Sequence, residues 1–452
     1  MPSSTEGPSP AVKLALEGPA GRVIWKLSAP NIVSNALITL VTIFDAFFVA
    51  KLGTTALASL ALVFPFQMLM QMFGNGAMGG GIASALSRAL GRHDIGKANA
   101  IAWHALVIGV VMSLVFVTVF GLFAEVVFTA MGGSGESLAG AVRYASVAFG
   151  GATASWLFFT LFAICRGSGD MRAPAVALMI STAAQISLSA GLTLGLVGLP
   201  KLGVVGPAVA LVVCQGAAGL GLLLYVMRGH LPVSMRPERL SWSPMADILR
   251  VGGLSMVNSV TIVLAVVVVT GLVGRYGMQA LGGYGLGSRL ELMLVPIAFG
   301  IGGALTTAVG LNIGAGQHAR ARSIALLGGA IAFGIFTPIG VALAIWPSLW
   351  LSWFTTAPEP FQSGAQYLQI VAPFYGVFVA GQVLYFASQG TGKMFAPVLV
   401  GFARLLVVSI TGAVTVWLGF GVGGVFWGVS AGMMTVGMGL WLCTQGPAWR
   451  VD

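Results

Sequence analysis

Residues 165–174 read CRGSGDMRAP and residues 388–397 read SQGTGKMFAP. The two stretches share both glycines of a turn, a Met and a closing Ala-Pro pair in the same register. Three further pairs follow the same order along the chain: LGTTALA at 52–58 with YGMQALG at 276–282, ALGRHDIGKA at 89–98 with GAGQHARARS at 314–323, and LGVVG at 202–206 with FGVGG at 420–424. The offsets lie between 218 and 225 residues, so the chain consists of two tandem copies of one unit.

The composition around these turns is that of a membrane protein. Of the 452 residues, 57% are hydrophobic and only 8% are charged, whereas about 25% of the residues in a soluble domain are charged. Glycine is abundant, with 65 residues, and it allows helices in lipid to approach closely. The apolar runs are long and continuous, unlike the short alternating segments of a transmembrane barrel. The sequence therefore predicts an all-α polytopic membrane protein.

A span requires about 20 mostly apolar residues, and about twelve such segments are present. Those of the first copy are 28–50, 58–84, 101–123, 145–165, 173–197 and 203–227, and those of the second are 252–273, 281–310, 324–346, 365–388, 396–418 and 421–443. We expect a flexible cytoplasmic tail at 1–22, a six-helix lobe at 23–227, a cytoplasmic linker at 228–250 and a second six-helix lobe at 251–452. Because six spans end on the side where they begin, the lobes are parallel repeats with a substrate path between them.

The positive charge of the chain indicates its orientation. Net charge is +10, and most Lys and Arg residues fall on one side of the alternating spans. The other side has only Lys51, Arg143, Lys201 and Arg275. This bias predicts a multi-pass protein of a bacterial-type inner membrane with both termini cytoplasmic. We expect a lipid bilayer as its surroundings and no nucleic-acid partner, because its basic residues form no soluble binding face.

Asp45 is the strongest candidate for chemistry, since it lies inside the first span. A charged carboxylate in hydrocarbon costs several kcal/mol unless it faces a cavity, finds a partner or takes up a proton. Asn31, Asn35, Thr42 and Asp45, with Ile38 between them, recur every three to four residues and form one polar stripe. We interpret the stripe as an ion-coupling site for a proton, with sodium at Asp45 as the other possibility. A purely structural hydrogen bond to a neighbouring helix is the alternative.

Two residues of the fifth span could complete this site. Gln185 and Ser189 are four residues apart and therefore share a helix face. Helix packing through polar side chains explains them equally well. The two copies also differ in polarity, because Asp45 aligns with Val269 and Gln67 with Glu291.

The eighth span contains an acid and a base. Arg289 and Glu291 are two residues apart, so they point in different directions and do not pair with each other. We take Gln67, Arg289 and Glu291 as substrate-cavity candidates, with snorkelling as the alternative for the charged pair. Arg404, in the eleventh span, is expected to snorkel to the cytoplasmic side. Phe44 and Met68 are candidates for an adaptable apolar wall of the cavity, with an ordinary lipid-facing or core surface as the alternative.

Several other classes of protein are excluded by missing motifs. GTGK at 390–393 lacks the first glycine of a phosphate loop and is followed by Met394, so it is no ATPase signature. No His or Cys spacing fits a metal, and Cys165, Cys214 and Cys443 are expected to be packing residues. No cluster of catalytic side chains stands out. We therefore expect neither an enzyme nor a bound cofactor, only H⁺ or Na⁺ as a coupling ion.

The chain resembles the multidrug and toxic compound extrusion (MATE) transporters. The resemblance rests on PNIVSNALITLVTIFDAFFVAKLGTTALA at 30–58 and on RLELMLVPIAFGIGGALTTAVGLNIGAGQHARAR at 289–322. It implies a pair of six-helix lobes that exchange substrate for H⁺ or Na⁺, with Asp45 as the coupling carboxylate. The family often has Asn and Asp on the fifth span and Thr on the sixth, where this chain has Gln185, Ser189 and Leu211. The ion site is thus poorer in oxygen ligands, which favours H⁺.

The combined prediction is a secondary-active antiporter that works by alternating access. It would act as a monomer and export cationic or amphipathic small molecules, with an organic cation as the expected substrate. The alternative is a lipid-linked saccharide flippase of the same superfamily. Its anionic diphosphate cargo would require several arginines in the cavity, whereas Arg289 is the only candidate.

Overall fold

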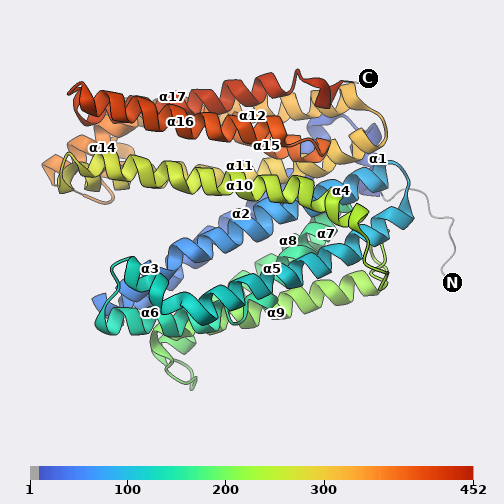
Figure 1. The fold of residues 1–452 in the computed structure, drawn as a ribbon, viewed down its shortest axis with the longest axis horizontal. Coiled ribbons are helices and arrows are strands. Elements are labelled where there is room, and N and C mark those ends of the chain that lie inside the picture. Colours follow the sequence, from blue (N-terminus) through green and yellow to red (C-terminus); the bar gives the residue numbers. More distant parts are fainter. Residues whose placement is uncertain (1–9, 356, 451–452) are drawn as a thin grey trace. The chain divides into compact units, whose positions relative to one another are not determined.

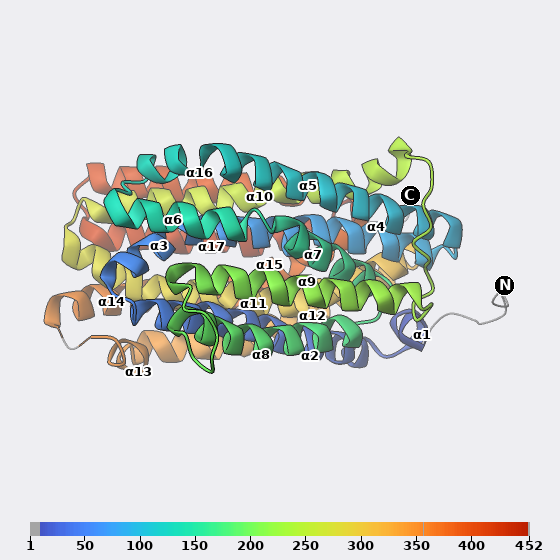
Figure 2. The same cartoon turned by 90° about the horizontal axis from the view of Figure 1, so that it is seen from below.

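The protein is almost entirely helical. The computed structural model describes residues 10–355 and 357–450, and these contain helices and turns but no β-strand. In each half of the chain, long helices lie side by side along a common direction (Figure 1, Figure 2).

The helices of the first half follow the predicted spans. They are α1 (Pro10–Glu17), α2 (Ala20–Ala50), α3 (Thr54–Gln71), the π-helix η1 (Met72–Met78), α4 (Gly79–Gly91), α5 (Ile95–Ala130), α6 (Gly135–Ala148), α7 (Ala152–Gly167), α8 (Arg172–Leu194), the 3₁₀ turn η2 (Gly203–Val205) and α9 (Gly206–Met227). Those of the second half are α10 (Trp242–Gly274), α11 (Met278–Gly314), α12 (His318–Ile345), α13 (Ser348–Leu351), α14 (Pro358–Val371), η3 (Ala372–Phe374), α15 (Tyr375–Thr391), α16 (Phe395–Trp417), α17 (Gly421–Cys443) and η4 (Pro447–Trp449).

The number of spans agrees with the sequence. Among the described residues, ten helices are long and apolar enough to cross a membrane, and the pair α6 and α7, bent by 49°, makes an eleventh. The predicted span 28–50 lies within the 31-residue helix α2, which completes the set of about twelve. The protein is therefore an all-α, multi-pass membrane protein.

The turns that join the helices repeat in both halves. Three pairs of glycines at equivalent positions have positive φ, a conformation that side chains with a Cβ rarely adopt. They are Gly53 (111°) with Gly277 (97°), Gly169 (87°) with Gly392 (78°), and Gly203 (61°) with Gly421 (70°). The repeat read from the sequence is thus present in the backbone.

The chain packs into two compact units whose boundaries differ from the predicted lobes. Of the described residues, unit 1 contains 10–13 and 33–252, and unit 2 contains 14–32, 253–355 and 357–450. Asn31 explains why the start of α2 belongs with unit 2, because its Nδ2 donates hydrogen bonds to the carbonyls of Phe299 (3.3 Å) and Gly300 (2.9 Å) on α11. A Cβ at Gly300 would lie only 2.8 Å from the Cα of Ile32, so the close approach requires glycine.

The described part of the predicted tail contains α1, which unit 2 holds at its C-terminal end. Asn312 Nδ2 donates to the carbonyl of Ala15 at 3.0 Å. Arg320 Nη2 donates to the same carbonyl at 3.3 Å and also to the carbonyl of Gly18. These are carbonyls that a helix leaves unsatisfied at its end, where a cation is also favourable. Within the predicted tail, residues 10–17 and 20–22 are therefore helical, and its flexibility and cytoplasmic location stay predictions.

The predicted linker 228–250 is irregular only as far as residue 241, because α10 begins at Trp242. One face of α5 binds the linker backbone through three side chains: Asn99 Oδ1 accepts from the amide of Ser234 (2.7 Å), Trp103 Nε1 donates to the carbonyl of Glu238 (3.1 Å), and His104 Nε2 accepts from the amide of Ser241 (2.9 Å). The linker is thus held against α5 by hydrogen bonds to its backbone.

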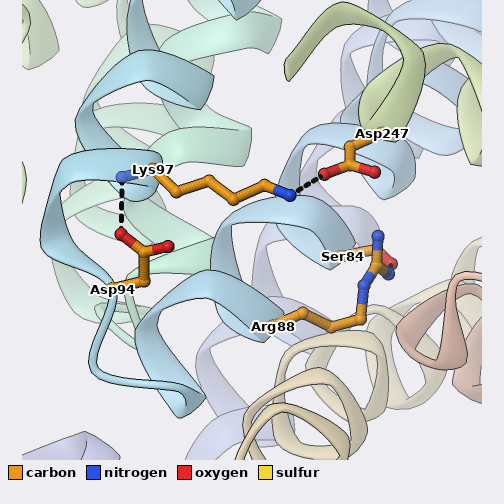
Figure 3. A network of polar contacts seen from close by, with 5 residues as sticks. All are labelled: Ser84, Arg88, Asp94, Lys97 and Asp247. Atoms are coloured by element: carbon orange, nitrogen blue, oxygen red, sulfur yellow. Dashed lines mark hydrogen bonds and ion pairs between the residues drawn. The ribbon is translucent and has the colours of Figure 1, made fainter. Parts of the chain in front are cut away.

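Charged side chains of α4, α5 and α10 make further contacts close to the linker (Figure 3). Lys97 Nζ lies 2.6 Å from Asp247 Oδ2, which ties α5 to the start of α10. Asp94 Oδ1 caps α5 by accepting from the amide of Lys97 at 2.9 Å, and Arg88 Nη1 donates to Ser84 Oγ. Because the Lys97–Asp247 pair is about one-third exposed, its contribution to stability is about 0–1 kcal/mol.

Candidate functional site

Asp45 and Ser189 meet inside unit 1. Ser189 Oγ donates a hydrogen bond of 2.5 Å to Asp45 Oδ1, so α8 supplies a partner for the carboxylate on α2. Ser189 is fully buried, whereas Asp45 keeps part of its surface exposed. A short bond from a neutral hydroxyl stabilises the carboxylate without adding a positive charge. The carboxylate could therefore gain a proton without leaving a cation behind.

Tyr144 and Gln67 extend the site across two more helices. Gln67 Nε2, on α3, donates to Tyr144 Oη, on α6, at 2.9 Å. The charge of Asp45 acts on the Tyr144 hydroxyl, which places the two groups within electrostatic range of each other. We call Asp45, Ser189, Tyr144 and Gln67 the unit 1 cluster. It contains one acid and no base.

Other predicted site residues lie around this cluster. Gln185 is buried on α8, one turn before Ser189. Thr42 and Phe44 are exposed on α2, and Met68 is half-buried on α3 next to Gln67. These positions suit a wall near the carboxylate, but their roles remain predictions.

The polar stripe of the first span is divided between the two units. Asn31 and Asn35 are both buried, but Asn31 belongs to unit 2, where it binds carbonyls of α11. The structure therefore does not bring Asn31 together with Asp45. Helical spacing could not predict that one helix contributes to two packing units.

Unit 2 has a different polar cluster. Glu291 Oε2, on α11, accepts from Tyr367 Oη, on α14, at 2.8 Å, and Glu291 Oε1 lies 3.1 Å from Arg404 Nη2, on α16. The side chains of Arg404 and Glu291 are only 9% and 14% exposed. We call Glu291, Tyr367 and Arg404 the unit 2 cluster. It pairs one acid with one base.

The expectation that Arg404 snorkels is wrong. Its guanidinium is buried against Glu291 and lies 5.1 Å from the ring centroid of Phe378, on α15. The ion pair and the aromatic face together replace the water that snorkelling would have provided. The expectation that Arg289 and Glu291 do not pair is confirmed, since Arg289 is exposed and Glu291 faces Arg404. Whether Gln67, Arg289 and Glu291 line the substrate cavity remains a prediction.

The two tyrosines were missed by the sequence reasoning. Tyr144 and Tyr367 are equivalent in the repeat and bind the equivalent residues Gln67 and Glu291. Both tyrosines are buried. Their recurrence at the repeat offset was the available signal, and it was overlooked because neither hydroxyl stands out within its own helix.

The described residues contain no group of three or more His, Cys, Asp or Glu side chains that could hold a metal ion.

Comparison with known proteins supports the resemblance. The sequence profile of the MatE family matches residues 30–190 and again 255–415. The chain is 25% identical over 403 residues to the "FAD transporter" of Shewanella oneidensis, which covers 87% of this chain and 88% of that protein. It is 23% identical over 407 residues to "Probable multidrug resistance protein NorM" of Thermotoga maritima, with 87% of each chain covered.

Solved structures show the same fold. A MOP superfamily transporter from Pyrococcus furiosus, described as having reverse polarity of its binding pocket, matches with a TM-score of 0.89 at 22% identity. A multidrug resistance MATE family transporter in an outward-facing conformation matches with a TM-score of 0.88 at 21% identity. Each match covers 97% of this chain and 98% of the other.

The family profile covers both halves and most of the chain, and it matches the repeat seen in the backbone. This family consists of transport proteins and not of enzymes. The chain belongs to the MatE family of multi-pass membrane transporters.

Proposed function

We propose that this transporter exports cationic or amphipathic small molecules in exchange for protons, by alternating access. Asp45 takes up the proton, and Ser189 changes its hydrogen bonding when it does so. The protein acts as a monomer in a bacterial-type inner membrane with both termini cytoplasmic. The single observation that carries the proposal is the Ser189–Asp45 hydrogen bond of 2.5 Å between two apolar helices.

The neutrality of its partners makes Asp45 suitable for exchange. An acid that lacks a cationic partner in an apolar site has two ways to lose its charge, protonation or cation binding, and these are mutually exclusive. A protonated Asp45 no longer attracts a cationic substrate. Alternating uptake of proton and substrate on the same carboxylate would couple the two fluxes, because each excludes the other.

A proton suits this site better than sodium. Sodium is held by several oxygen ligands at once, and Ser189 contributes a single hydroxyl that already donates to Asp45. Leu211 stands where the family often has a threonine, so the site lacks one hydroxyl that could hold sodium. A proton requires only the carboxylate itself.

The proposed charge of the cargo follows from both clusters. The unit 1 cluster carries an acid without a base, and in the unit 2 cluster Arg404 is neutralised by Glu291. Relatives named as multidrug resistance or multidrug export proteins support broad cargo. The relative named "FAD transporter" makes an anionic flavin dinucleotide the second cargo to test.

A lipid-linked saccharide flippase is less well supported. Its diphosphate cargo would require several cationic side chains. Arg404 is already paired with Glu291.

The test uses purified protein in liposomes with an acidic lumen. Protons that leave should drive uptake of ethidium, and Asp45→Asn should reduce this uptake to the level of empty liposomes. Glu125→Gln, which removes an exposed acid at the end of α5, is the matched control and should transport normally. A parallel assay with a sodium gradient and a third with flavin dinucleotide as cargo separate the coupling ions and the cargo classes.

Proton-driven uptake that persists in Asp45→Asn would exclude Asp45 from the mechanism. Uptake driven by sodium alone would contradict the choice of coupling ion. Transport of the flavin but not of ethidium would contradict the choice of cargo.

A further inference from the structure

A small cavity lies within unit 2, where Arg404 of the unit 2 cluster forms part of its wall. It has a volume of about 20 Å³ open to the centre of a water-sized occupant. About 10–15 Å³ by this measure is enough for one water molecule. The polar part of its wall comes from α10, α15 and α16: Asn258, Thr261, Gln382, Tyr385 and Arg404. The cavity is thus large enough for one occupant of roughly atomic size.

Arg404 connects this cavity to Glu291. Its Nη2 is engaged by Glu291, while its Nε is buried and has no hydrogen-bond partner among the described residues. A buried guanidinium N–H without a partner costs about 1–3 kcal/mol or more. An occupant of the cavity could provide the missing acceptor.

The residues that line the cavity favour an anion over a cation as its occupant. The amides of Asn258 and Gln382, the hydroxyl of Tyr385 and the guanidinium of Arg404 can donate hydrogen bonds to an occupant. The single proton of Thr261 Oγ1 is already donated to the carbonyl of Asn258 at 2.7 Å. The residues that line the cavity include a permanent cation and no carboxylate. A sodium ion would therefore meet a like charge, whereas an anion would meet donors and an opposite charge.

Charge balance couples this site to Glu291. With Glu291 ionised, the pair with Arg404 is neutral, and an added anion would leave one uncompensated negative charge in a low-dielectric interior. With Glu291 protonated, Arg404 would be left as an unpaired cation, and an anion in the cavity would restore neutrality. Proton and anion should therefore bind together.

The groups around Glu291 do not replace this counter-charge. Tyr367 of α14 donates to it, and Tyr284 of α11 and Tyr375 of α15 lie within electrostatic range. On α12 the basic residues are confined to the first five positions, where Arg320 binds carbonyls at the end of α1. Arg404 is thus the cation that loses its partner when Glu291 takes up a proton.

We propose that this cavity is a binding site for a monatomic anion such as chloride, held by Arg404 and occupied when Glu291 is protonated. Arg404 would then be neutralised by the Glu291 carboxylate when that acid is ionised, and by a halide bound from solution when it is protonated. This inference concerns binding by unit 2 alone, and it does not depend on the function proposed for Asp45.

The test is chloride binding to the purified full-length protein, measured as excess line broadening of the ³⁵Cl resonance in buffers without other halides. Broadening should be displaced by bromide and should increase as the pH falls. The increase approaches tenfold per pH unit if only the protonated form binds. Glu291→Gln, which mimics the protonated acid, should bind chloride equally at acidic and alkaline pH.

The loss-of-site variant is Glu291→Gln/Arg404→Ser. It places in unit 2 the side chains that unit 1 has at the equivalent positions, Gln67 and Ser181, so no buried charge is left unpaired. This variant should show no displaceable broadening, and Arg275→Gln, which removes an exposed cation, should bind like the wild type. Wild-type broadening that equals that of the double variant would mean that the cavity holds only water, and the proposal would be wrong. Broadening that is the same at every pH would refute the link to Glu291.

Discussion

Unit 1 and unit 2 share one scaffold but place their charges on different helices. In unit 1 the acid is Asp45, on the first helix of the repeat, and its partner is Ser189, on the fifth. The equivalent residues of unit 2 are Val269, which is buried, and Gly412, where a Cβ would lie 2.5 Å from Leu272 Cδ1. That region of unit 2 is apolar and tightly packed.

The second helix of the repeat shows the opposite pattern. Unit 2 has Glu291 there, paired with Arg404, whereas unit 1 has the neutral Gln67, and Ser181 stands where Arg404 would be. The tyrosine that binds the second helix is retained in both units. The difference teaches that protonating an acid with a neutral partner leaves no buried charge, whereas protonating an acid paired with a base leaves that base without a counter-ion.

Breaking the ion pair of unit 2 on one side should have the largest effect. Arg404→Ser leaves Glu291 buried without its cation, and we expect a loss of about 3–5 kcal/mol in the free energy of unfolding. The double variant Glu291→Gln/Arg404→Ser should lose about 1 kcal/mol or less, because its side chains match those of unit 1. Unfolding in mixed micelles measures both, and equal losses would show that the pair is not a coupled unit.

The two equivalent tyrosines provide the next comparison. Tyr367→Phe removes a hydrogen bond to a carboxylate and should cost about 1.5–3 kcal/mol, whereas Tyr144→Phe removes one from an amide and should cost about 0.5–1.5 kcal/mol. The same unfolding assay applies to both variants. A larger loss for Tyr144→Phe would contradict the assignment of the charged partner to unit 2.

Ser189 tests the exchange site of unit 1. Ser189→Ala removes the donor to Asp45, and we expect proton-driven uptake of ethidium to fall roughly tenfold, which corresponds to about 1.4 kcal/mol. Ser187→Ala is the matched control, since Ser187 is exposed two residues earlier on α8 and bonds only to the carbonyl of Ala183, at 3.0 Å. Equal effects of the two substitutions would show that the loss comes from α8 itself and not from the bond to Asp45.

The exposed ion pair of unit 1 should give the smallest effect. Lys97→Met removes the partner of Asp247 and should cost less than about 1 kcal/mol, and the loss should shrink further in high salt. A double-mutant cycle with Asp247→Asn isolates the interaction. A coupling energy above that of the buried Glu291–Arg404 pair would reverse the ranking of the two units.

The sequence was sufficient for the scaffold but not for the partners of the polar residues. Long apolar runs and paired glycine turns predicted about twelve spans and the repeat, because each of these signals is local. Arg404 was misplaced because its partner Glu291 lies 113 residues away, on another helix. Helical spacing shows which residues share a face, but it cannot show which helix that face meets.

Asp45 and Ser189 show that the sequence could predict a buried acid but could not identify its hydrogen-bond partner. The buried acid was predicted from its cost in lipid, and Ser189 was one of two equally supported interpretations until the structure placed its hydroxyl at 2.5 Å. Asn31 shared the stripe with Asp45 but packs with α11, because one helix contributes to both units.

This division of α2 has a consequence for biosynthesis. Asn31 emerges from the ribosome 268 residues before its partner Phe299, which corresponds to a delay of roughly 13–54 s at typical elongation rates. During that interval the α11 carbonyls that Asn31 binds have not yet been synthesised. The nascent chain must therefore keep its first helix available until the second half has been inserted, and premature pairing of that helix is a specific way for assembly to fail.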